Sequence, residues 1–315
     1  LSDRFDEPIR YVIVRIKVNS EIETKKILLG CDLDRTIIPN GIQKESPLAR
    51  PLIRRLARCP NIYLTYVSGR DQKLVLDAIA EFHLPLPDYV IGDVGTTLYR
   101  IINGNWQLSD DWKAEIGQDW KHLDREELAG LLGDINEIQL QDPEKQSQYK
   151  LSYDTDQNVD YQKLAMNIRG RLAKSGVRVS IIWSVDEISQ IGLLDILPAR
   201  ANKLQAIRFL MQQEQFSEER TVFAGDSGND LAVLTSGLQS ILVKNGMDEV
   251  REKAIEKLSL KHLTHRLYLP KGNFYGMNGN YAAGVIEGLA HYIPETNAQI
   301  AKAVEKIKQA ERSRL

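Results

Sequence analysis

The chain has 315 residues, of which 43% are hydrophobic and 27% charged, and its formal net charge at pH 7 is −2. Its length suits two domains, and its composition is ordinary for a globular protein. The near-neutral charge gives no support to nucleic acid or a membrane surface as a partner, and no apolar run approaches the length of a membrane-spanning helix. These properties predict a soluble, cytoplasmic protein.

The beginning of the chain is the least informative part. Residues 10–18 have a strand pattern and residues 19–25 look like a polar linker, so residues 1–25 are expected to be a leader or to add an extra strand. The chain begins with Leu1 rather than Met, which is consistent with a piece of a longer protein. Cys31 and Cys59 lie in apolar contexts and are expected to be free thiols.

The most informative stretch is residues 26–36, where an apolar run ends in two carboxylates. Residues 27–29 have the pattern of a short strand buried on both faces, the type found in parallel sheets. Asp32 and Asp34 can then share one side at the carboxyl end of this strand, where open α/β folds bind their ligands. By itself the stretch fits either an active-site floor or an acidic turn.

A second strand and helix follow. Residues 61–67 have a strand pattern that ends at Ser68 and Arg70, and residues 71–82 have a helix pattern. Ser68 is predicted to cap that helix, with Asp71 completing a capping box. The same hydroxyl could hold a phosphate at the helix N-terminus, with Arg70 as a fixed positive charge.

A middle segment then changes character. Residues 103–196 hold three of the four tryptophans and a strand–helix–strand arrangement with its own apolar positions. We interpret this segment as an inserted α+β cap that lies over the sheet as a lid.

The earlier pattern resumes after the cap. Lys203 opens a predicted helix, and residues 221–224 form a short buried strand that leads into Asp226 and Asp230. The sequence therefore predicts an α/β fold, a doubly wound, Rossmann-like parallel sheet with an inserted cap. The core domain is expected to comprise residues 26–102 and 197–295, and the C-terminal helix residues 296–315.

Four polar groups are thus expected at one edge of the sheet: Asp32 with Asp34, Ser68 with Arg70, Lys203, and Asp226 with Asn229 and Asp230. Carboxylate oxygens suit Mg²⁺, whereas the lysine and the serine offer donors to a phosphate. A free carboxylate beside both indicates phosphoryl transfer, in which one Asp attacks phosphorus and a second moves the proton.

These motifs resemble the four ordered motifs of the haloacid dehalogenase-like phosphohydrolases. The matching stretches are Asp32-Leu33-Asp34-Arg35-Thr36, Ser68-Gly69-Arg70, Lys203 and Gly225-Asp226-Ser227-Gly228-Asn229-Asp230. The insertion resembles the C2-type cap that some members carry between the second and third motifs. Within that subgroup, residues 150–153, 194–203 and 283–291 resemble sucrose-phosphate phosphatases. The resemblance covers residues 26–294.

The resemblance implies a role for each residue. Asp32 would be the nucleophile and a metal ligand, and Asp34 the general acid/base that gives its backbone carbonyl to the metal. Asp226 and Asp230 would complete the Mg²⁺ site, and Lys203 would hold the reacting phosphate. Further phosphate or sugar contacts are expected from Thr36, Ser68, Gly69, Arg70, Lys150, Ser152, Ser184, Asp195 and Asn229. For Lys150 and Ser152, a solvent-facing strand edge is the alternative.

Two departures concern the substrate. Thr97 stands where sucrose-phosphate phosphatases tend to have an acidic residue, and residues 183–197 form a longer segment than expected. The resemblance implies Mg²⁺-dependent hydrolysis of sucrose 6-phosphate to sucrose and phosphate through an aspartyl-phosphate. The alternatives are a phosphatase for a mannosylfructose-phosphate or glycosylglycerate-phosphate type of substrate, and a non-catalytic regulatory domain that binds sugar phosphate. The expected ligand is a small sugar phosphate, and a sugar-phosphate synthase is a candidate partner.

Overall fold

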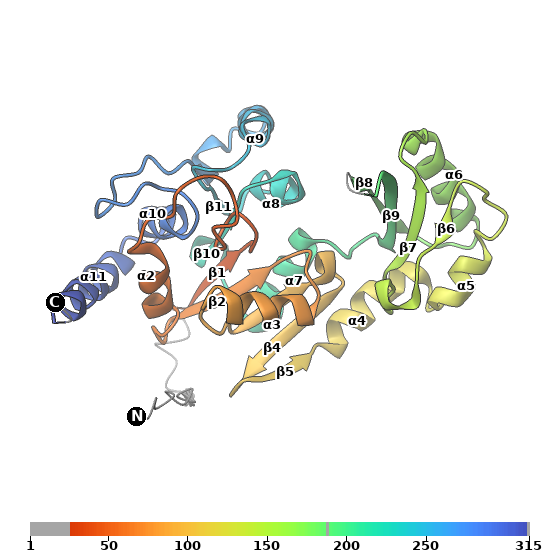
Figure 1. Cartoon of the computed structure of the whole chain (residues 1–315). Coiled ribbons are helices and arrows are strands. Elements are labelled where there is room, and N and C mark those ends of the chain that lie inside the picture. Colours follow the sequence, from red (N-terminus) through yellow and green to blue (C-terminus); the bar gives the residue numbers. More distant parts are fainter. Residues whose placement is uncertain (1–25, 187–188, 314–315) are drawn as a thin grey trace, which may run out of the picture.

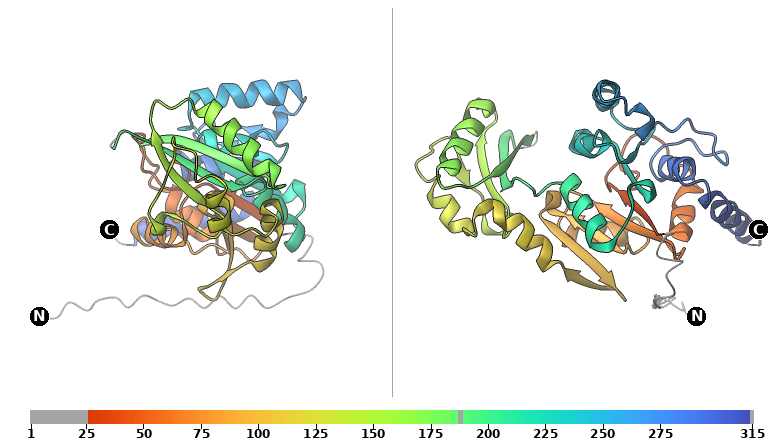
Figure 2. Two further views of the ribbon diagram at one scale, coloured as in Figure 1. Left: turned by 90° about the vertical axis from the view of Figure 1, so that its right-hand side faces the viewer. Right: turned by 180° about the vertical axis from the view of Figure 1, so that it is seen from behind.

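The computed structural model describes residues 26–186 and 189–313. These residues form a larger core domain and a smaller cap domain that lie side by side (Figure 1, Figure 2). The predicted leader and its strand pattern lie outside the described residues. No helix in the described ranges is long and apolar enough to cross a bilayer.

The core domain is built on a mixed sheet. In the described residues its strands run in the order β12 (Leu267–Tyr268), β11 (Gln239–Leu242), β10 (Thr221–Gly225), β1 (Ile27–Cys31), β2 (Ile62–Val67), β3 (Tyr89–Gly92), β4 (Thr97–Ile102) and β5 (Asn105–Leu108). The strands from β12 to β3 are parallel, whereas β4 and β5 extend the sheet as an antiparallel hairpin. The predicted parallel core is confirmed.

Helices cover both faces of this sheet because its central strands are apolar at successive positions. In β1, Ile27 and Leu29 contribute to one apolar cluster and Leu28 to the other. The helices of the first cluster are α2 (Ala49–Leu56), α3 (Gln72–Glu81), α10 (Ala282–Tyr292) and α11 (Thr296–Arg312). Those of the second are α4 (Asp110–Gly117), α7 (Lys203–Glu214), α8 (Leu231–Leu234) and α9 (Asp248–Leu260). This is the doubly wound arrangement.

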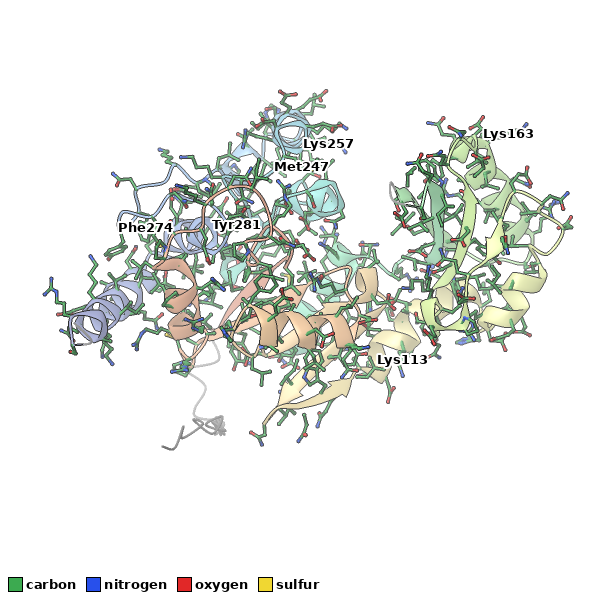
Figure 3. The ribbon with its side chains drawn as sticks, viewed as in Figure 1. Lys113, Lys163, Met247, Lys257, Phe274 and Tyr281 are labelled. Atoms are coloured by element: carbon green, nitrogen blue, oxygen red, sulfur yellow. The ribbon has the colours of Figure 1, made fainter. Side chains whose placement is uncertain are left out.

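The cap domain has its own antiparallel sheet and helices. Its described strands run in the order β6 (Gln139–Leu140), β7 (Leu151–Asp156), β9 (Ile191–Pro198) and β8 (Val179–Asp186). The helices α5 (Arg125–Gly130) and α6 (Tyr161–Lys174) lie on the side of this sheet remote from the core domain (Figure 1, Figure 2). Lys163 of α6 marks that outer side in Figure 3. The sheet's other face is therefore turned towards the core domain.

The cap begins later than the predicted residue 103. β5 pairs with β4 in the main sheet, for example through Ile101 and Trp106, because Asn103 and Gly104 form a tight turn with positive φ angles of 51° and 81°. α4 also belongs to the core domain, since Trp112 is buried in its second apolar cluster. Residues 105–117 thus extend the core domain.

The two connections between the domains meet at Asp119, whose side chain is fully buried. Its carboxylate accepts a hydrogen bond of 2.7 Å from the backbone N–H of Arg200 and contacts the guanidinium of Arg178. Its backbone carbonyl accepts a second hydrogen bond, of 2.8 Å, from the N–H of Arg178. Asp119, which lies on the connection that leaves the core domain, is therefore bonded both to the cap and to the connection that returns from it.

Candidate active site

Parallel pairing brings three loops together at the carboxyl edge of the main sheet. Cys31 at the end of β1 lies opposite Ala224 of β10 and Tyr66 of β2. The residues that follow these strands therefore emerge next to one another. α7 begins at the same edge, with Asn202 capping the helix through a 3.0 Å hydrogen bond from the N–H of Gln205. This placement brings Lys203 beside the strand ends.

Lys203 connects two of the predicted motifs. Its Nζ lies 2.7 Å from Asp32 Oδ1 and 2.7 Å from Asp230 Oδ1. Asn229 Oδ1 accepts a longer hydrogen bond of 3.3 Å from the same amine. Burial lowers the pKa of Lys203, but the charges of Asp230 and Asp32 outweigh it and hold the pKa above its usual value. The buried amine is therefore a fixed positive charge at the centre of the site.

Asp230 is fixed by its backbone surroundings as well as by the lysine. Its Oδ2 accepts hydrogen bonds from the N–H groups of Asp226 at 3.0 Å and Ser227 at 3.3 Å. This requires close approach to Gly225, where a Cβ would lie 2.5 Å from the carboxylate. The glycine in this motif thus leaves the space that the carboxylate fills.

Three buried carboxylates form a candidate metal site, which we call the acidic cluster: Asp32, Asp226 and Asp230. One oxygen from each lies within 4.8 Å of the others. Burial, together with the neighbouring carboxylates, raises the pKa of Asp32 to about 7 against the influence of Lys203, and it also raises the pKa of Asp226. An all-oxygen donor set with surplus negative charge fits Mg²⁺.

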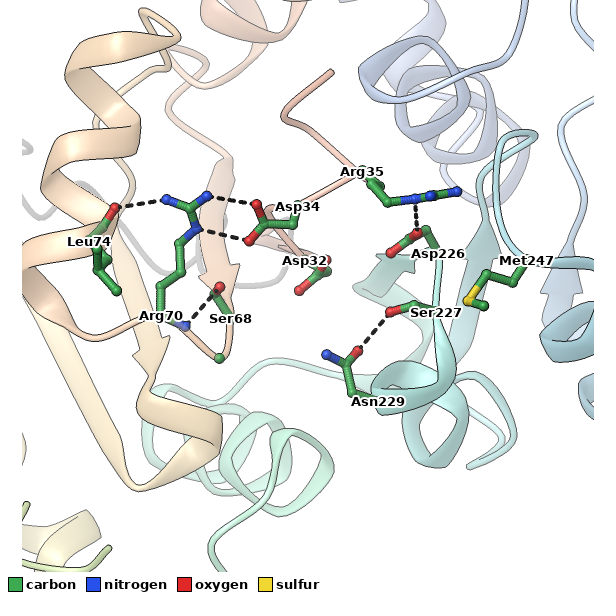
Figure 4. Close-up of a pocket in the computed structure, with 11 residues that line it drawn as sticks. Asp32, Asp34, Arg35, Ser68, Arg70, Leu74, Asp226, Ser227, Asn229 and Met247 are labelled. Carbon is green, nitrogen blue, oxygen red and sulfur yellow. Dashed lines mark hydrogen bonds and ion pairs between the residues drawn. The ribbon is translucent and has the colours of Figure 1, made fainter. Parts of the chain in front are cut away.

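A pocket of ≈ 340 Å³ opens above the acidic cluster (Figure 4). Its lining residues are Asp32, Asp34, Arg35, Ser68, Gly69, Arg70, Leu74, Asp226, Ser227, Asn229 and Met247. Asp34 is held on one side of this pocket by two hydrogen bonds from Arg70 and one of 2.7 Å from Asn40. The hydrogen bonds from Arg70 lower the pKa of Asp34. The pKa of Asp32 is therefore raised, whereas that of Asp34 is lowered.

The predicted helix cap at Ser68 is wrong. α3 starts later, and Asp71 caps it by accepting a 2.8 Å hydrogen bond from the N–H of Leu74. Ser68 Oγ instead accepts a 3.2 Å hydrogen bond from the N–H of Arg70 in the preceding loop. Because this loop separates the strand from the helix, the serine hydroxyl lies in the pocket lining.

Thr36 does not line the pocket. It is fully buried, and its Oγ1 has no hydrogen-bond partner among the described residues. The residue type fits the motif, and a phosphate contact from this side chain stays a prediction.

The predicted cap residues are likewise not part of the pocket lining. Lys150 forms an ion pair of 2.8 Å with Asp93 of the core domain. Ser152 is buried and donates a 2.5 Å hydrogen bond to Asp195 on the neighbouring strand, whereas Ser184 is exposed. The strand register places Ser152 opposite Asp195. A solvent-facing edge is therefore wrong for Ser152, and a role in sugar binding stays a prediction.

Several lining residues were not singled out from the sequence. Arg35 lies inside the first motif and Ser227 inside the fourth, so their positions in the sequence could have identified them as site residues. Leu74 and Met247 could not have been identified in this way, because an apolar side chain on a helix or in a loop indicates packing as readily as a ligand contact.

Comparisons with known proteins identify relatives of this chain. Residues 25–293 match the family model of sucrose-6F-phosphate phosphohydrolase. A protein of Nitrosococcus oceani named "Putative HAD-like hydrolase" is 54% identical over 91% of this chain and 77% of its own length. The mannosylfructose-phosphate phosphatase of Agrobacterium fabrum is 29% identical over 84% of this chain and 96% of its own.

A solved structure shows the same fold. It is the sucrose-phosphatase of Synechocystis in complex with sucrose and phosphate, with a TM-score of 0.63, 24% identity, and coverage of 85% of this chain and 98% of its own. The chain therefore belongs to the sucrose-6F-phosphate phosphohydrolase family of haloacid dehalogenase-like hydrolases.

Proposed function

We propose that this protein is a Mg²⁺-dependent phosphatase that hydrolyses a phosphorylated disaccharide, with sucrose 6-phosphate as the leading substrate. The observation that carries the proposal is the contact of Lys203 with Asp32 and Asp230 beneath a pocket that Asp34 also lines. The proposed nucleophile and proton carrier thus line one space, and a fixed cation contacts the nucleophile.

Each residue has a defined part in the proposed reaction. Asp32 attacks phosphorus and forms an aspartyl-phosphate while Asp34 gives its proton to the leaving sugar oxygen. Asp34, now ionised, removes a proton from the water that hydrolyses the intermediate. Lys203 stabilises negative charge on the transferred group, and Ser68 and Gly69 line the wall where phosphate oxygens would lie.

The acidic cluster and the backbone carbonyl of Asp34 are the proposed metal ligands. When bound there, Mg²⁺ would neutralise charge on the phosphoryl group and orient it towards Asp32. The fit rests on three carboxylates with oxygens within 4.8 Å of one another and on burial that raises the pKa of Asp32 and of Asp226.

The choice of sugar rests on relatedness and is the finer part of the proposal. The family model supports sucrose 6-phosphate, while the relative in Agrobacterium fabrum makes mannosylfructose phosphate the second candidate. Lys150, Ser152, Ser184 and Asp195 are proposed sugar contacts on the cap. Association with a sugar-phosphate synthase stays a prediction from the sequence.

A panel of sugar phosphates tests the proposal. Phosphate release is measured with Mg²⁺ and with EDTA for the wild type, for Asp32→Asn, and for Asp77→Asn, a matched change at an exposed position on α3. The proposal expects the highest kcat/KM with sucrose 6-phosphate, no release with EDTA, and loss only in Asp32→Asn. Low and similar kcat/KM values for all sugar phosphates would reject sucrose 6-phosphate as the substrate. Full activity of Asp32→Asn would reject the mechanism.

A further inference from the structure

Arg35 contacts a carboxylate of the acidic cluster from the solvent side. Its Nε donates a 3.0 Å hydrogen bond to Asp226 Oδ2, and the side chain of Asp226 is only 2% exposed whereas that of Arg35 is 41% exposed. Figure 4 shows the guanidinium lying directly across the Asp226 carboxylate. The positively charged side chain of Arg35 thus covers Asp226, one of the proposed metal ligands.

The backbone around Arg35 directs its side chain to this position. Arg35 has a φ of 57°, a left-handed conformation that is uncommon for a residue with a Cβ. Its N–H donates 2.8 Å to Asn40 Oδ1, and its carbonyl accepts 2.6 Å from Asn245 Nδ2. Nη2 also donates to the carbonyl of Asn245 at 3.2 Å. Hydrogen bonds on both sides therefore hold an otherwise strained residue in place.

The charges of the site explain what this contact does. When ionised, the acidic cluster carries three negative charges, and Lys203 supplies one positive charge between Asp32 and Asp230. Arg35 supplies a second at Asp226, the member that Lys203 does not contact. Arg70, the other arginine of the lining, is held by Asp34. Without metal, each carboxylate of the cluster therefore has a cationic partner.

We propose that Arg35 is an internal counter-ion that competes with the divalent cation for Asp226 and swings away when the cation binds. A guanidinium beside a divalent cation would be repelled, and the side chain, 41% exposed, can turn to solvent at the cost of its hydrogen bonds to Asp226 and Asn245. The contact therefore weakens metal binding in the resting protein. This inference rests on the proposed function only in assigning the acidic cluster as a metal site.

Binding of Mn²⁺ alone to the metal-free full chain, measured by calorimetry, tests the inference. Arg35→Gln is compared with wild type, with Arg35→Lys, which keeps the charge, and with Arg251→Gln, which removes a charge paired with Asp248 instead. We expect Arg35→Gln to bind Mn²⁺ roughly three- to tenfold more tightly than the other three. Thermal melting of each variant verifies that it is folded.

The possible failures are distinguishable. Equal affinity of Arg35→Gln and Arg251→Gln, or weaker binding by Arg35→Gln, would overturn the role of Arg35 while leaving the metal site intact. If even the wild type binds no Mn²⁺, the assignment of the acidic cluster fails, and the proposed metal-dependent function fails with it.

Discussion

The guanidinium of Arg70 holds both carboxylate oxygens of Asp34, with Nε 2.8 Å from Oδ2 and Nη2 2.7 Å from Oδ1. This paired geometry is the strongest form of an arginine–carboxylate contact. It favours the ionised form of Asp34, which suits the step that activates water. To donate a proton in the first step, Asp34 must be loosened from Arg70, and an arriving phosphate that attracts Arg70 would do so.

Replacing Arg70 with Gln is expected to reduce stability in a pH-dependent way. Because Arg70 lowers the pKa of Asp34 in the folded state, its contribution is present above the unfolded pKa of about 3.9 and is lost as the pH falls through the folded value. Asp34 is 41% exposed, so the effect at pH 6 should be at most about 1 kcal/mol. Chemical denaturation at pH 6 and pH 3 measures it. A difference between wild type and Arg70→Gln that is the same at both pH values would contradict the assignment.

Replacing Lys203 with Met is expected to destabilise the metal-free protein strongly. The change leaves the buried carboxylates of Asp32 and Asp230 without their cation, a loss typically worth about 3–5 kcal/mol. Added Mg²⁺ should restore part of it by supplying another positive charge. Unfolding free energies with and without Mg²⁺ are compared with those of Lys113→Met, whose exposed pair with Asp110 should matter little. A similar small loss in both variants would show that Lys203 does not neutralise the cluster.

The sequence could predict the chemical centre because its residues follow buried strands whose pairing is parallel. Asp32, Asp226 and Lys203 needed only the order of strands and helices to be placed at one edge. The contact between Arg35 and Asp226 could not be predicted, since it spans 191 positions and depends on one left-handed backbone angle. The order of strands and helices does not determine where an individual side chain such as that of Arg35 points.

The cap was harder to predict for two physical reasons. The hairpin through Asn103 and Gly104 continues the main sheet, but its Trp106 looked like the start of a new apolar unit. In β7, the sequence left open whether Ser152 faces solvent, because its burial against Asp195 depends on which strand lies beside it. Strand pairing in the main sheet decided the first point, and packing within the cap decided the second.

Asp119→Asn is expected to reduce kcat/KM for a sugar phosphate more than kcat/KM for a small aryl phosphate. The buried carboxylate joins both connections to the cap, and losing its charge weakens its contacts with Arg178 and Arg200 by about 1–3 kcal/mol. Cap position should matter only for a substrate with a sugar to bind. Values of kcat/KM for both substrates are compared with those of Asp110→Asn, an exposed site on α4. Equal losses with both substrates would place the effect in the core domain instead.

Metal binding is expected to strengthen as the pH rises towards 7. The pKa of Asp32 in the metal-free protein is about 7, mainly because of burial, so at lower pH the cation must displace a proton. The apparent Mg²⁺ affinity should therefore fall by up to about tenfold per unit below pH 7 and level off above it. Calorimetric titrations at pH 6, 7 and 8 check this. Affinity independent of pH over that range would exclude Asp32 as a ligand that carries a proton in the metal-free state.

The most direct test of the account is whether Asp32 becomes phosphorylated. Asp34→Asn with Mg²⁺ and sucrose 6-phosphate is quenched rapidly in acid, and its peptides are analysed by mass spectrometry. The change slows both the formation of the intermediate and its hydrolysis by water, so wild type and variant are each quenched over a series of times. We predict a phosphoryl group on the peptide that contains Asp32 and none in Asp32→Asn. Release of phosphate by the wild type, with no phosphorylated Asp32 at any quench time in either wild type or Asp34→Asn, would contradict the account.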